Sequence, residues 1–452
     1  MNTVLYSVPS GYIARNLLRT GVIERLLARD VRIVILTPAW NDPEFLQELS
    51  FDNRIVIDRL HKYNLPENPD LFHRAFTSAC YRTWKARWAQ AHQYLIGLNA
   101  GLHTVLGDRP YRHIFRKYRP SLVVTATTGN VAKSDLPVLW EARASRVKTL
   151  CLVHSWDNIT GLFKGMMLAR PDWLGTWNEL QKREAVEVHF YDPDRVRVVG
   201  PPQFDLYRNP DIFAPRDSFL RKIGFDPNKK VVTLAEATMH SAENTYILDI
   251  LLDAIREEKF VAPVQLFCRM HPRRPPELSR KNYEKYLNNP LITFDFPDPH
   301  TRSLGWNPTR ASMIYLANTL RHTDVLVNVA STVTIEASIL DVPVVNLGFS
   351  LTQPDRFRER ILDGAWRHHY RYILERNGTY IAKDPGDLIK GINHYLMDPS
   401  LHREERRSVA RDLCYGCDGK SAERIASLIL SLLEQKRSQT PERVTLAPEP
   451  GS

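Results

Sequence analysis

Short apolar runs alternate with segments of helical periodicity along most of the chain, and this alternation constrains the fold more than any other feature of the sequence. The run Val31–Leu36 (VRIVIL) stops at Thr37-Pro38, as expected for a strand buried on both faces. Before it, apolar residues between Ile13 and Leu27 recur at spacings of three and four, which indicates a helix. Similar units recur as far as Val199. Strands that alternate with helices in this way predict a mainly parallel sheet with helices on both faces.

The pattern stops and then starts again, which indicates two α/β units. The segment Gly200–Phe219 is rich in proline and lacks periodicity, as a linker does. A second series of strands and helices begins at Lys229, and Ser421–Lys436 is an amphipathic helical segment. We therefore expect a first domain at 1–205 with a basic helical insertion at about 66–119, a second domain at 216–397, a helical segment at 398–436 that packs back on the first domain, and a disordered tail at 437–452.

The charge of the chain favours anionic partners. The formal net charge is +10, and basic residues concentrate between Phe72 and Arg119, together with Trp84 and Trp88. Nucleotide phosphates, nucleic acid or an anionic membrane surface fit such a segment. No RNP, KH, helix-turn-helix or zinc signature is present, so we expect no nucleic-acid partner. Two readings of the segment stay open: contact with an anionic membrane, or packing of its aromatic side chains on the first domain.

Cysteine usage and hydropathy point to the cytoplasm. Five cysteines in 452 residues, an odd number, argue against a disulfide framework. Cys414 and Cys417 form a CxxC pair, interpreted as two reduced thiols in a loop because no second pair of metal ligands accompanies it. No stretch approaches the roughly 20 apolar residues that span a bilayer, and the N-terminus lacks the pattern of a signal peptide. We predict a cytoplasmic protein, with a peripheral position at the inner face of the membrane as the alternative.

The strongest cluster of candidate site residues follows the apolar run Asp324–Ala330. Ser331 or Thr332 can cap the helix that begins there, whose free N–H groups make an anion site. Glu336 lies one turn into this helix, where its carboxylate can accept hydrogen bonds from both hydroxyls of a ribose. The alternative is a capping box or a surface glutamate in an ordinary loop.

A second group of basic side chains follows another predicted strand. In RMHPRRP, Arg269, His271 and Arg273 stand where the strand PVQLFC ends. Guanidinium and imidazole groups at the carboxyl edge of a sheet can donate to a diphosphate. A lone histidine is usually structural, but this one is flanked by arginines.

The order of these motifs resembles the C-terminal nucleotide-binding half of the GT-B glycosyltransferases. It is also similar to the related nucleotide-sugar 2-epimerases and CDP-glycerol glycerophosphotransferases. The matching segments are RMHP, STVTIEASILDVPVVNLG, VRVVGPPQFDLY, HSWDNITGLFKG, which looks like a segment of surface-polysaccharide members, and DGKSAERIASLI. The resemblance spans about Leu122–Leu433. It implies an α/β, GT-B-like fold, in which two Rossmann-like domains turn their parallel sheets toward a central cleft. It also implies a nucleotide-sugar donor that acts as substrate, a glycan or lipid-linked acceptor, and no separate cofactor.

The segment HSWDN supplies the candidates for chemistry on the acceptor. It follows the predicted strand Lys148–Val153 and so lies at the carboxyl edge of the first sheet. His154 and Asp157 are the two groups that can remove a proton from an acceptor hydroxyl. Asp157 can instead shape a turn. Lys164, Asp135 and His61 are weaker candidates.

Metal chemistry is not expected from the sequence. Asp192-Pro193-Asp194 matches a metal-binding DxD pattern, but it precedes its strand and reads as a proline turn. The chain is thus predicted to be a metal-independent GT-B-type glycosyltransferase that extends a surface or lipid-linked glycan. The CDP-glycerol enzymes usually carry Thr-Asp-Tyr-Ser-Ser where this chain has TDVLVNVAST, so a CDP-alditol phosphotransferase is the second reading. A basic nucleic-acid-binding protein is the third.

Overall fold

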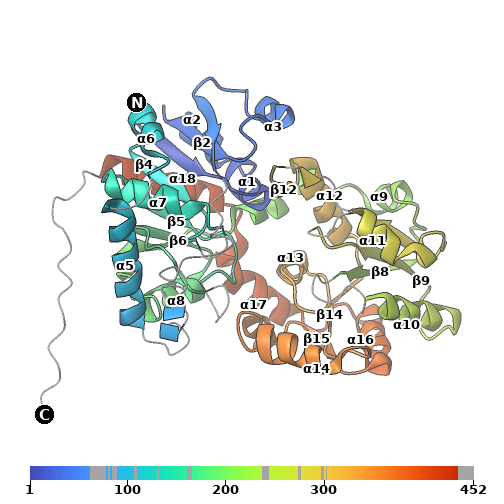
Figure 1. Cartoon of the computed structure of the whole chain (residues 1–452). Helices are drawn as coiled ribbons and strands as arrows, with labels where there is room; N and C mark the ends of the chain where they lie inside the picture. The colour runs from blue at the N-terminus through green and yellow to red at the C-terminus, as the bar shows by residue number, and fades with distance from the viewer. Residues whose placement is uncertain are drawn as a thin grey trace, which may run out of the picture.

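The computed structural model describes residues 1–61, 78–79, 82–83, 89–105, 109–129, 132–159, 165–236, 244–272, 276–296, 300–301 and 303–435. Each half of the chain forms an open parallel sheet with helices on both sides (Figure 1). This confirms the fold class expected from the sequence. The predicted insertion is described only in part, as helices α5 (Ala89–Val105) and α6 (Arg112–Tyr118). The predicted tail at 437–452, Trp84 and Trp88 lie outside the described residues.

The first sheet has seven parallel strands in the order β3-β2-β1-β4-β5-β6-β7. Their bounds are β1 Thr3–Ser7, β2 Arg32–Thr37, β3 Ile55–Arg59, β4 Leu122–Thr125, β5 Lys148–Leu152, β6 Trp173–Thr176 and β7 Val196–Val198. Its helices are α1 Gly11–Leu18, α2 Val22–Leu27, α3 Pro43–Glu48, α7 Asp135–Ala144 and α8 Glu179–Glu187, besides α5 and α6. The winding direction reverses between β1 and β4. Ligands of doubly wound sheets bind beyond the carboxyl ends of the strands at such a reversal.

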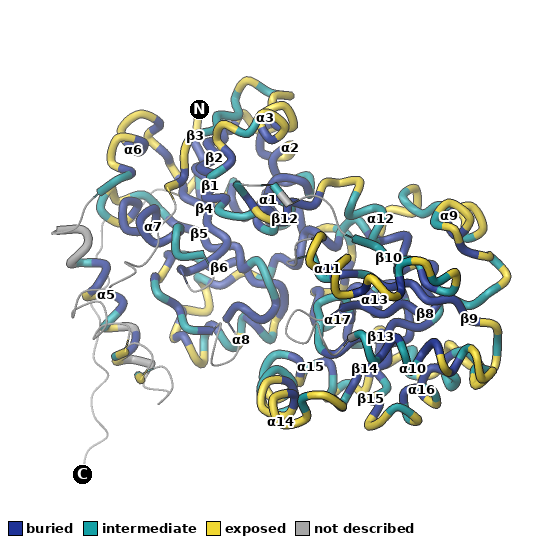
Figure 2. Tube along the Cα trace, turned by 45° about the vertical axis from the view of Figure 1, so that its right-hand side comes forward, coloured by how far each residue is buried: buried dark blue, intermediate teal, exposed yellow. Residues whose placement is uncertain are grey.

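The second sheet repeats this plan with six parallel strands in the order β10-β9-β8-β13-β14-β15, and its reversal lies between β8 and β13. Its strands are β8 Lys230–Ala235, β9 Val264–Arg269, β10 Ile292–Asp295, β13 Val325–Asn328, β14 Val344–Leu347 and β15 Tyr380–Ala382. Its helices include α9 Arg216–Lys222, α10 Asn244–Arg256, α11 Pro276–Asn282, α12 Arg310–Arg321, α13 Val333–Ile339, α14 Pro354–Phe357, α15 Arg371–Leu374, α16 Pro385–Met397 and α17 Arg403–Leu413. Figure 2 shows the central strands of both sheets buried, among them β1, β4, β8 and β13, whereas α3, α9 and α14 carry exposed surface.

The last helix, α18 (Ser421–Glu434), belongs to the first half of the molecule. Its apolar side chains, such as Ile425 and Ile429, join the core that α1 and α2 form over the first sheet. Figure 1 shows this red helix among the blue elements. The Asp205 carboxylate, in the linker, accepts hydrogen bonds from the backbone N–H groups of Ser421 and Ala422 at 3.1 and 2.8 Å. It thereby satisfies the free donors at the start of the helix.

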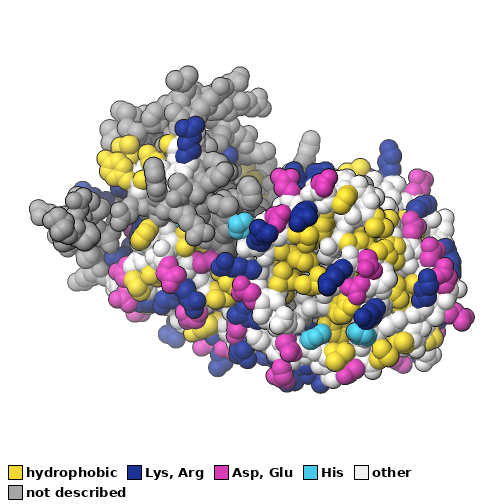
Figure 3. Space-filling view, turned by 90° about the horizontal axis from the view of Figure 1, so that it is seen from below, with side chains coloured by type: hydrophobic (Ala, Val, Ile, Leu, Met, Phe, Trp, Pro, Cys, Tyr) yellow, Lys and Arg dark blue, Asp and Glu magenta, His cyan; other side chains and the backbone are white. Residues whose placement is uncertain are grey.

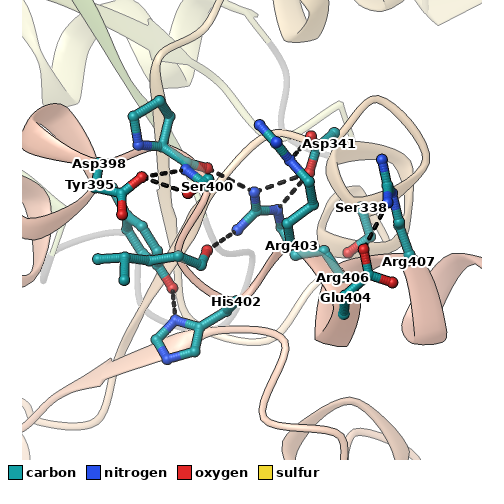
Figure 4. Close-up of polar contacts among 12 residues, drawn as sticks. Ser338, Asp341, Tyr395, Asp398, Ser400, His402, Arg403, Glu404, Arg406 and Arg407 are labelled. Atoms are coloured by element: carbon teal, nitrogen blue, oxygen red, sulfur yellow. Dashed lines mark hydrogen bonds and ion pairs between the residues drawn. The ribbon is translucent and has the colours of Figure 1, made fainter.

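Helix α17, which also lies within the segment predicted at 398–436, packs against the second half. It packs against α13 through a core that includes Val409 and Leu413. Arg406 is fully buried and bonds the Asp341 carboxylate, with 2.8 Å between Nη2 and Oδ1 (Figure 4). Asp341 follows α13 directly, so this ion pair fixes the end of the helix that carries Glu336.

A small hairpin joins the two halves on another side. Strands β11 (His300–Thr301) and β12 (Gly305–Trp306) pair antiparallel within the second half. A Cβ atom at Gly11 would lie 2.0 Å from the backbone oxygen of Trp306, so only glycine permits this approach of α1 to the hairpin. Next to it, Arg19 donates to the Asn307 side chain at 2.7 Å. The carboxyl edges of the two sheets are thereby brought to the same junction.

Candidate functional site

Glu336 is a buried carboxylate at the junction of the two halves. It lies on α13, after β13, as the sequence predicted, and is 8% exposed. The Tyr207 hydroxyl, from the linker, donates to Oε2, while Oε1 makes no hydrogen bond with a described residue. Burial raises the pKa of Glu336, which the Tyr207 bond and the charges of Arg15 and Arg269 oppose. The free oxygen can accept a hydrogen bond from a ligand hydroxyl.

Arg269 ends β9 and reaches the junction from the second half. Its guanidinium pairs with the Asp295 carboxylate at the end of β10, and both side chains are nearly buried. Part of its hydrogen-bonding capacity is therefore used within the protein, although the sequence predicted it as a phosphate ligand. Arg15, on α1, acts on Glu336 from the first half. Two arginines from different halves thus act on the same carboxylate.

The segment that follows β9 is anchored by another buried acid, Glu236, which lies directly after β8. The backbone N–H of His271 donates to Glu236 Oε2 at 2.9 Å, and the Tyr283 hydroxyl donates to Oε1 at 3.4 Å. This places His271 beside the reversal point of the second sheet, where its side chain is partly exposed. The predicted ligand Arg273 lies outside the described residues.

Ser331 and Thr332 have different tasks at the start of α13. The Ser331 hydroxyl oxygen accepts from the backbone N–H of Val333 at 3.4 Å, a long capping bond. Thr332 occupies the position before the helix without capping it through its side chain. Its hydroxyl oxygen accepts from the Trp156 indole N–H at 3.2 Å instead, so a bond between the halves replaces the predicted cap.

The HSWDN segment lies at the carboxyl end of β5, as predicted, and faces the second half through Trp156. The backbone oxygens of His154 and Ser155 accept from Asn16 and Gln181, each at 3.0 Å. Asp157 is buried and accepts a 2.6 Å hydrogen bond from the Ser155 hydroxyl. His154 is only partly buried, so it is the more accessible of the two candidate bases.

Asp135 occupies the reversal point of the first sheet. It is fully buried, and its two carboxylate oxygens accept from the hydroxyls of Ser7, at the end of β1, and Thr127, beyond β4, each at 2.6 Å. Burial raises its pKa to about 7 against the effect of these hydrogen bonds. With no exposed surface, Asp135 can position the two loops but cannot reach a substrate.

The remaining predictions fare differently. Lys164 lies outside the described residues, and the backbone N–H of His61 donates to the Tyr111 hydroxyl at 2.9 Å. Asp192 caps a short turn by accepting from the Asp194 N–H, as expected for a proline turn.

Cys414 and Cys417 are buried free thiols. Within the described part of the chain, no group of three or more His, Cys, Asp and Glu side chains is placed to hold a metal ion. None of the helices described there is long and apolar enough to cross a bilayer.

Sequence reasoning missed Arg15, Tyr207 and Glu236. Tyr207 lies in the VRVVGPPQFDLY motif, which supports the resemblance to the GT-B enzymes without pointing to the tyrosine as a site residue. Glu236 ends the apolar run KKVVTLAEA, and a carboxylate directly after a strand was a usable signal. Arg15 sits in an ordinary helical pattern, and only the docking of α1 on the hairpin brings its charge to Glu336.

No family model matches this sequence, and no curated protein does either. Several solved structures share its fold over nearly the whole chain. They include the complex of MnaA from S. aureus with UDP (13% identity, TM-score 0.58, 98% of this chain and 100% of that one). A glycosyltransferase from Rickettsia africae is 14% identical, with a TM-score of 0.53 and coverage of 96% and 99%. A variant of the wall teichoic acid polymerase TagF is 13% identical, with a TM-score of 0.52 and coverage of 96% and 89%. At these identities the likeness establishes the fold, which is the GT-B architecture.

Proposed function

We propose that this protein is a GT-B-type glycosyltransferase that moves a sugar from a nucleotide-sugar donor to a hydroxyl of a surface or lipid-linked glycan. The observation that carries the proposal is the buried Glu336 carboxylate at the junction of the halves. Tyr207 donates to one of its oxygens, no described residue bonds the other, and the charges of Arg15 and Arg269 favour its ionised form. A ribose hydroxyl donates to such an oxygen, and a diphosphate is attracted by Arg15 and Arg269.

The donor accordingly binds at the carboxyl edge of the second sheet. Glu336 accepts from the ribose, while Arg15, His271 and the backbone around Ser331 meet the diphosphate charge. UDP is the natural first probe, because MnaA, which shares the fold, has been solved with UDP. No metal is required by this scheme, since the cations of the protein offset the charge of the leaving group.

The acceptor hydroxyl approaches from the first sheet. His154 removes its proton while the acceptor oxygen forms a bond to the anomeric carbon of the sugar. The bond between this carbon and the diphosphate oxygen breaks, and the electron pair leaves with the nucleoside diphosphate. Asp157 acts through the segment, because its bond to Ser155 fixes the turn that presents His154.

Alditol-phosphate transfer is the second candidate, because the motifs of the chain are also similar to those of the CDP-glycerol glycerophosphotransferases. The two reactions and epimerisation give different nucleotide products. Sugar transfer releases a nucleoside diphosphate, alditol-phosphate transfer releases a nucleoside monophosphate, and epimerisation isomerises the sugar on its nucleotide. The test incubates the protein with UDP-sugars and CDP-alditols plus a glycolipid fraction as acceptor, and separates the nucleotides by chromatography. Release of UDP that depends on the acceptor and is lost in His154→Gln supports the proposal. Release of CMP, or an isomerised UDP-sugar without release, contradicts it.

A further inference from the structure

A surface pocket of about 420 Å³ lies on the first half, away from the junction. It is lined by α6, the end of α7 and the chain that enters β4 and β5. Pro120 and Val147, which precede these two strands, place it at the amino edge of the first sheet. The HSWDN segment follows the opposite, carboxyl edge. Figure 1 shows α6 at the far side of the first half from α13.

Arginine dominates the lining of this pocket. Arg109, Arg112, Arg116 and Arg119 face it, against a single acid, Glu141. The acid is already neutralised: Arg109 binds both its oxygens, through Nε at 2.9 Å and Nη2 at 2.7 Å. The Ser145 hydroxyl adds a third bond at 2.8 Å. Glu141 is buried, so this network forms a fixed floor that orients Arg109 and leaves its Nη1 without a partner among the described residues.

The other three arginines are exposed and form no ion pair with any residue that the structure describes. Arg112 and Arg116 stand four apart on α6, where like charges destabilise a helix. The two positive charges therefore repel each other and destabilise the helix. An anion bound between the two guanidinium groups would offset this repulsion. Elsewhere positive and negative side chains alternate: on the face shown in Figure 3, many Lys and Arg side chains lie beside Asp and Glu.

The side chains that line the pocket indicate which class of anion it can bind. Phe115, Pro120 and Val147 supply apolar surface beside the arginines. Guanidinium groups bind phosphate in a fork geometry, and several around one pocket suit a phosphate with more than one negative charge. We infer that this pocket binds a phosphomonoester or diphosphate that carries an apolar or sugar group. Two sources share this chemistry, the headgroup of an anionic lipid and a soluble phosphorylated compound.

The site is tested with inorganic pyrophosphate, titrated calorimetrically into wild type and pocket variants without added nucleotide. Any pyrophosphate that binds at the proposed donor site is common to all these proteins, so the difference between them reports the pocket. Arg112→Gln/Arg116→Gln should weaken binding about tenfold or more for each arginine removed. Arg25→Gln/Arg29→Gln, which removes two exposed arginines of the same spacing on the same half, should leave it unchanged. Arg112→Lys/Arg116→Lys keeps the charge but loses the fork, so its affinity should lie between those of the wild type and the glutamine variant.

Vesicles distinguish the two sources. Co-sedimentation with phosphatidylcholine vesicles that contain phosphatidic acid, competed by pyrophosphate and lost in the glutamine variant, identifies a lipid headgroup. Pyrophosphate binding with the protein left in the supernatant identifies a soluble ligand. The inference is overturned if the folded glutamine variant binds pyrophosphate and vesicles as the wild type does, or if the lysine variant equals the wild type, since diffuse charge then explains the binding. Neither result depends on whether the junction binds UDP.

Discussion

Six strands follow the same order in the two sheets, but the reversal points at the carboxyl edges of these sheets carry different chemistry. In the first sheet, Asp135 is held by the hydroxyls of Ser7 and Thr127, and Asp157 by that of Ser155. In the second sheet, Glu236 and Glu336 also accept from the hydroxyls of Tyr283 and Tyr207, but two of the acids interact with arginines as well. Arg269 pairs with Asp295, and both Arg269 and Arg15 act on Glu336.

Under the proposed function, this difference places one substrate at each edge. An edge whose carboxylates are held by neutral hydroxyls can order a loop and place a base against a neutral alcohol. An edge with buried acids and nearby arginines can hold a ligand that has both hydroxyls and negative charge. A sugar acceptor fits the first description and a nucleotide diphosphate the second. Variants at the two edges should therefore affect different kinetic constants.

The largest effect is expected from His154→Gln, which removes the proposed base. Loss of a general base lowers kcat by about 10²–10⁴-fold, whereas the affinity for UDP should stay unchanged because the other edge binds it. Asp157→Asn should show a smaller loss in kcat, because it acts through the turn. Steady-state kinetics and UDP titration of both variants make the check. A parallel loss of UDP affinity would contradict the proposal that the two edges bind different substrates.

The next effect is on stability and involves only the first edge. Folding raises the pKa of Asp135 from 3.8 to about 7, so the folded state holds the proton more tightly than the unfolded state. This contribution is fully present below pH 4 and is lost as the pH rises to about 7. Asparagine mimics the protonated form. The unfolding free energy of Asp135→Asn, relative to wild type, should therefore rise with pH, by at most ~1.4 kcal/mol per unit.

Urea unfolding of both proteins across this range measures the difference. The comparison with wild type matters because other buried groups titrate in the same window. Burial lowers the pKa of His189 to about 4, so the contribution of His189 to the unfolding free energy rises with pH, opposite to that of Asp135. Burial raises the pKa of Glu184 to about 7, so its contribution falls with pH, as that of Asp135 does. Both are common to the two proteins. A constant difference between the unfolding curves would show that Asp135 is ionised throughout.

The smallest effect concerns the second edge and is selective. His271→Ala and Ser331→Ala should weaken binding of a nucleoside diphosphate about tenfold, and binding of the nucleoside much less. Under the proposed function, both residues meet the diphosphate and not the ribose. Calorimetry with UDP and with uridine measures the two affinities. Equal losses for both ligands would mean that these side chains only support the fold.

Much of the fold follows from the apolar patterning. Buried runs such as Val31–Leu36 and Asp324–Ala330 have no other stable place than the middle of a parallel sheet, and the structure puts both there. Strand β15 (Tyr380–Ala382) was not predicted, because three residues give little pattern. The hairpin of β11 and β12 has two-residue strands and gave no signal. The separate packing of α17 and α18 depends on tertiary contacts, since both helices are amphipathic.

The candidate site was predictable where a motif sits on a strand end. Glu336 and the HSWDN segment lie where the local pattern placed them. The hydrogen-bond partners were not predictable, because they come from elsewhere in the chain: Tyr207 of the linker for Glu336, and Trp156 of the first half for Thr332. Such pairs depend on how the halves dock, which local periodicity does not encode.

The most direct test of the account is UDP binding to Glu336→Gln, measured by calorimetry beside wild type and Glu404→Gln. Glu404 is an exposed glutamate on α17 and serves as the matched control. If Glu336 accepts hydrogen bonds from the ribose, losing its charge costs about 1.5–3 kcal/mol, so UDP should bind Glu336→Gln about ten- to hundredfold more weakly than wild type or Glu404→Gln. Equal affinity for UDP in all three folded proteins would contradict the placement of the donor at the second sheet.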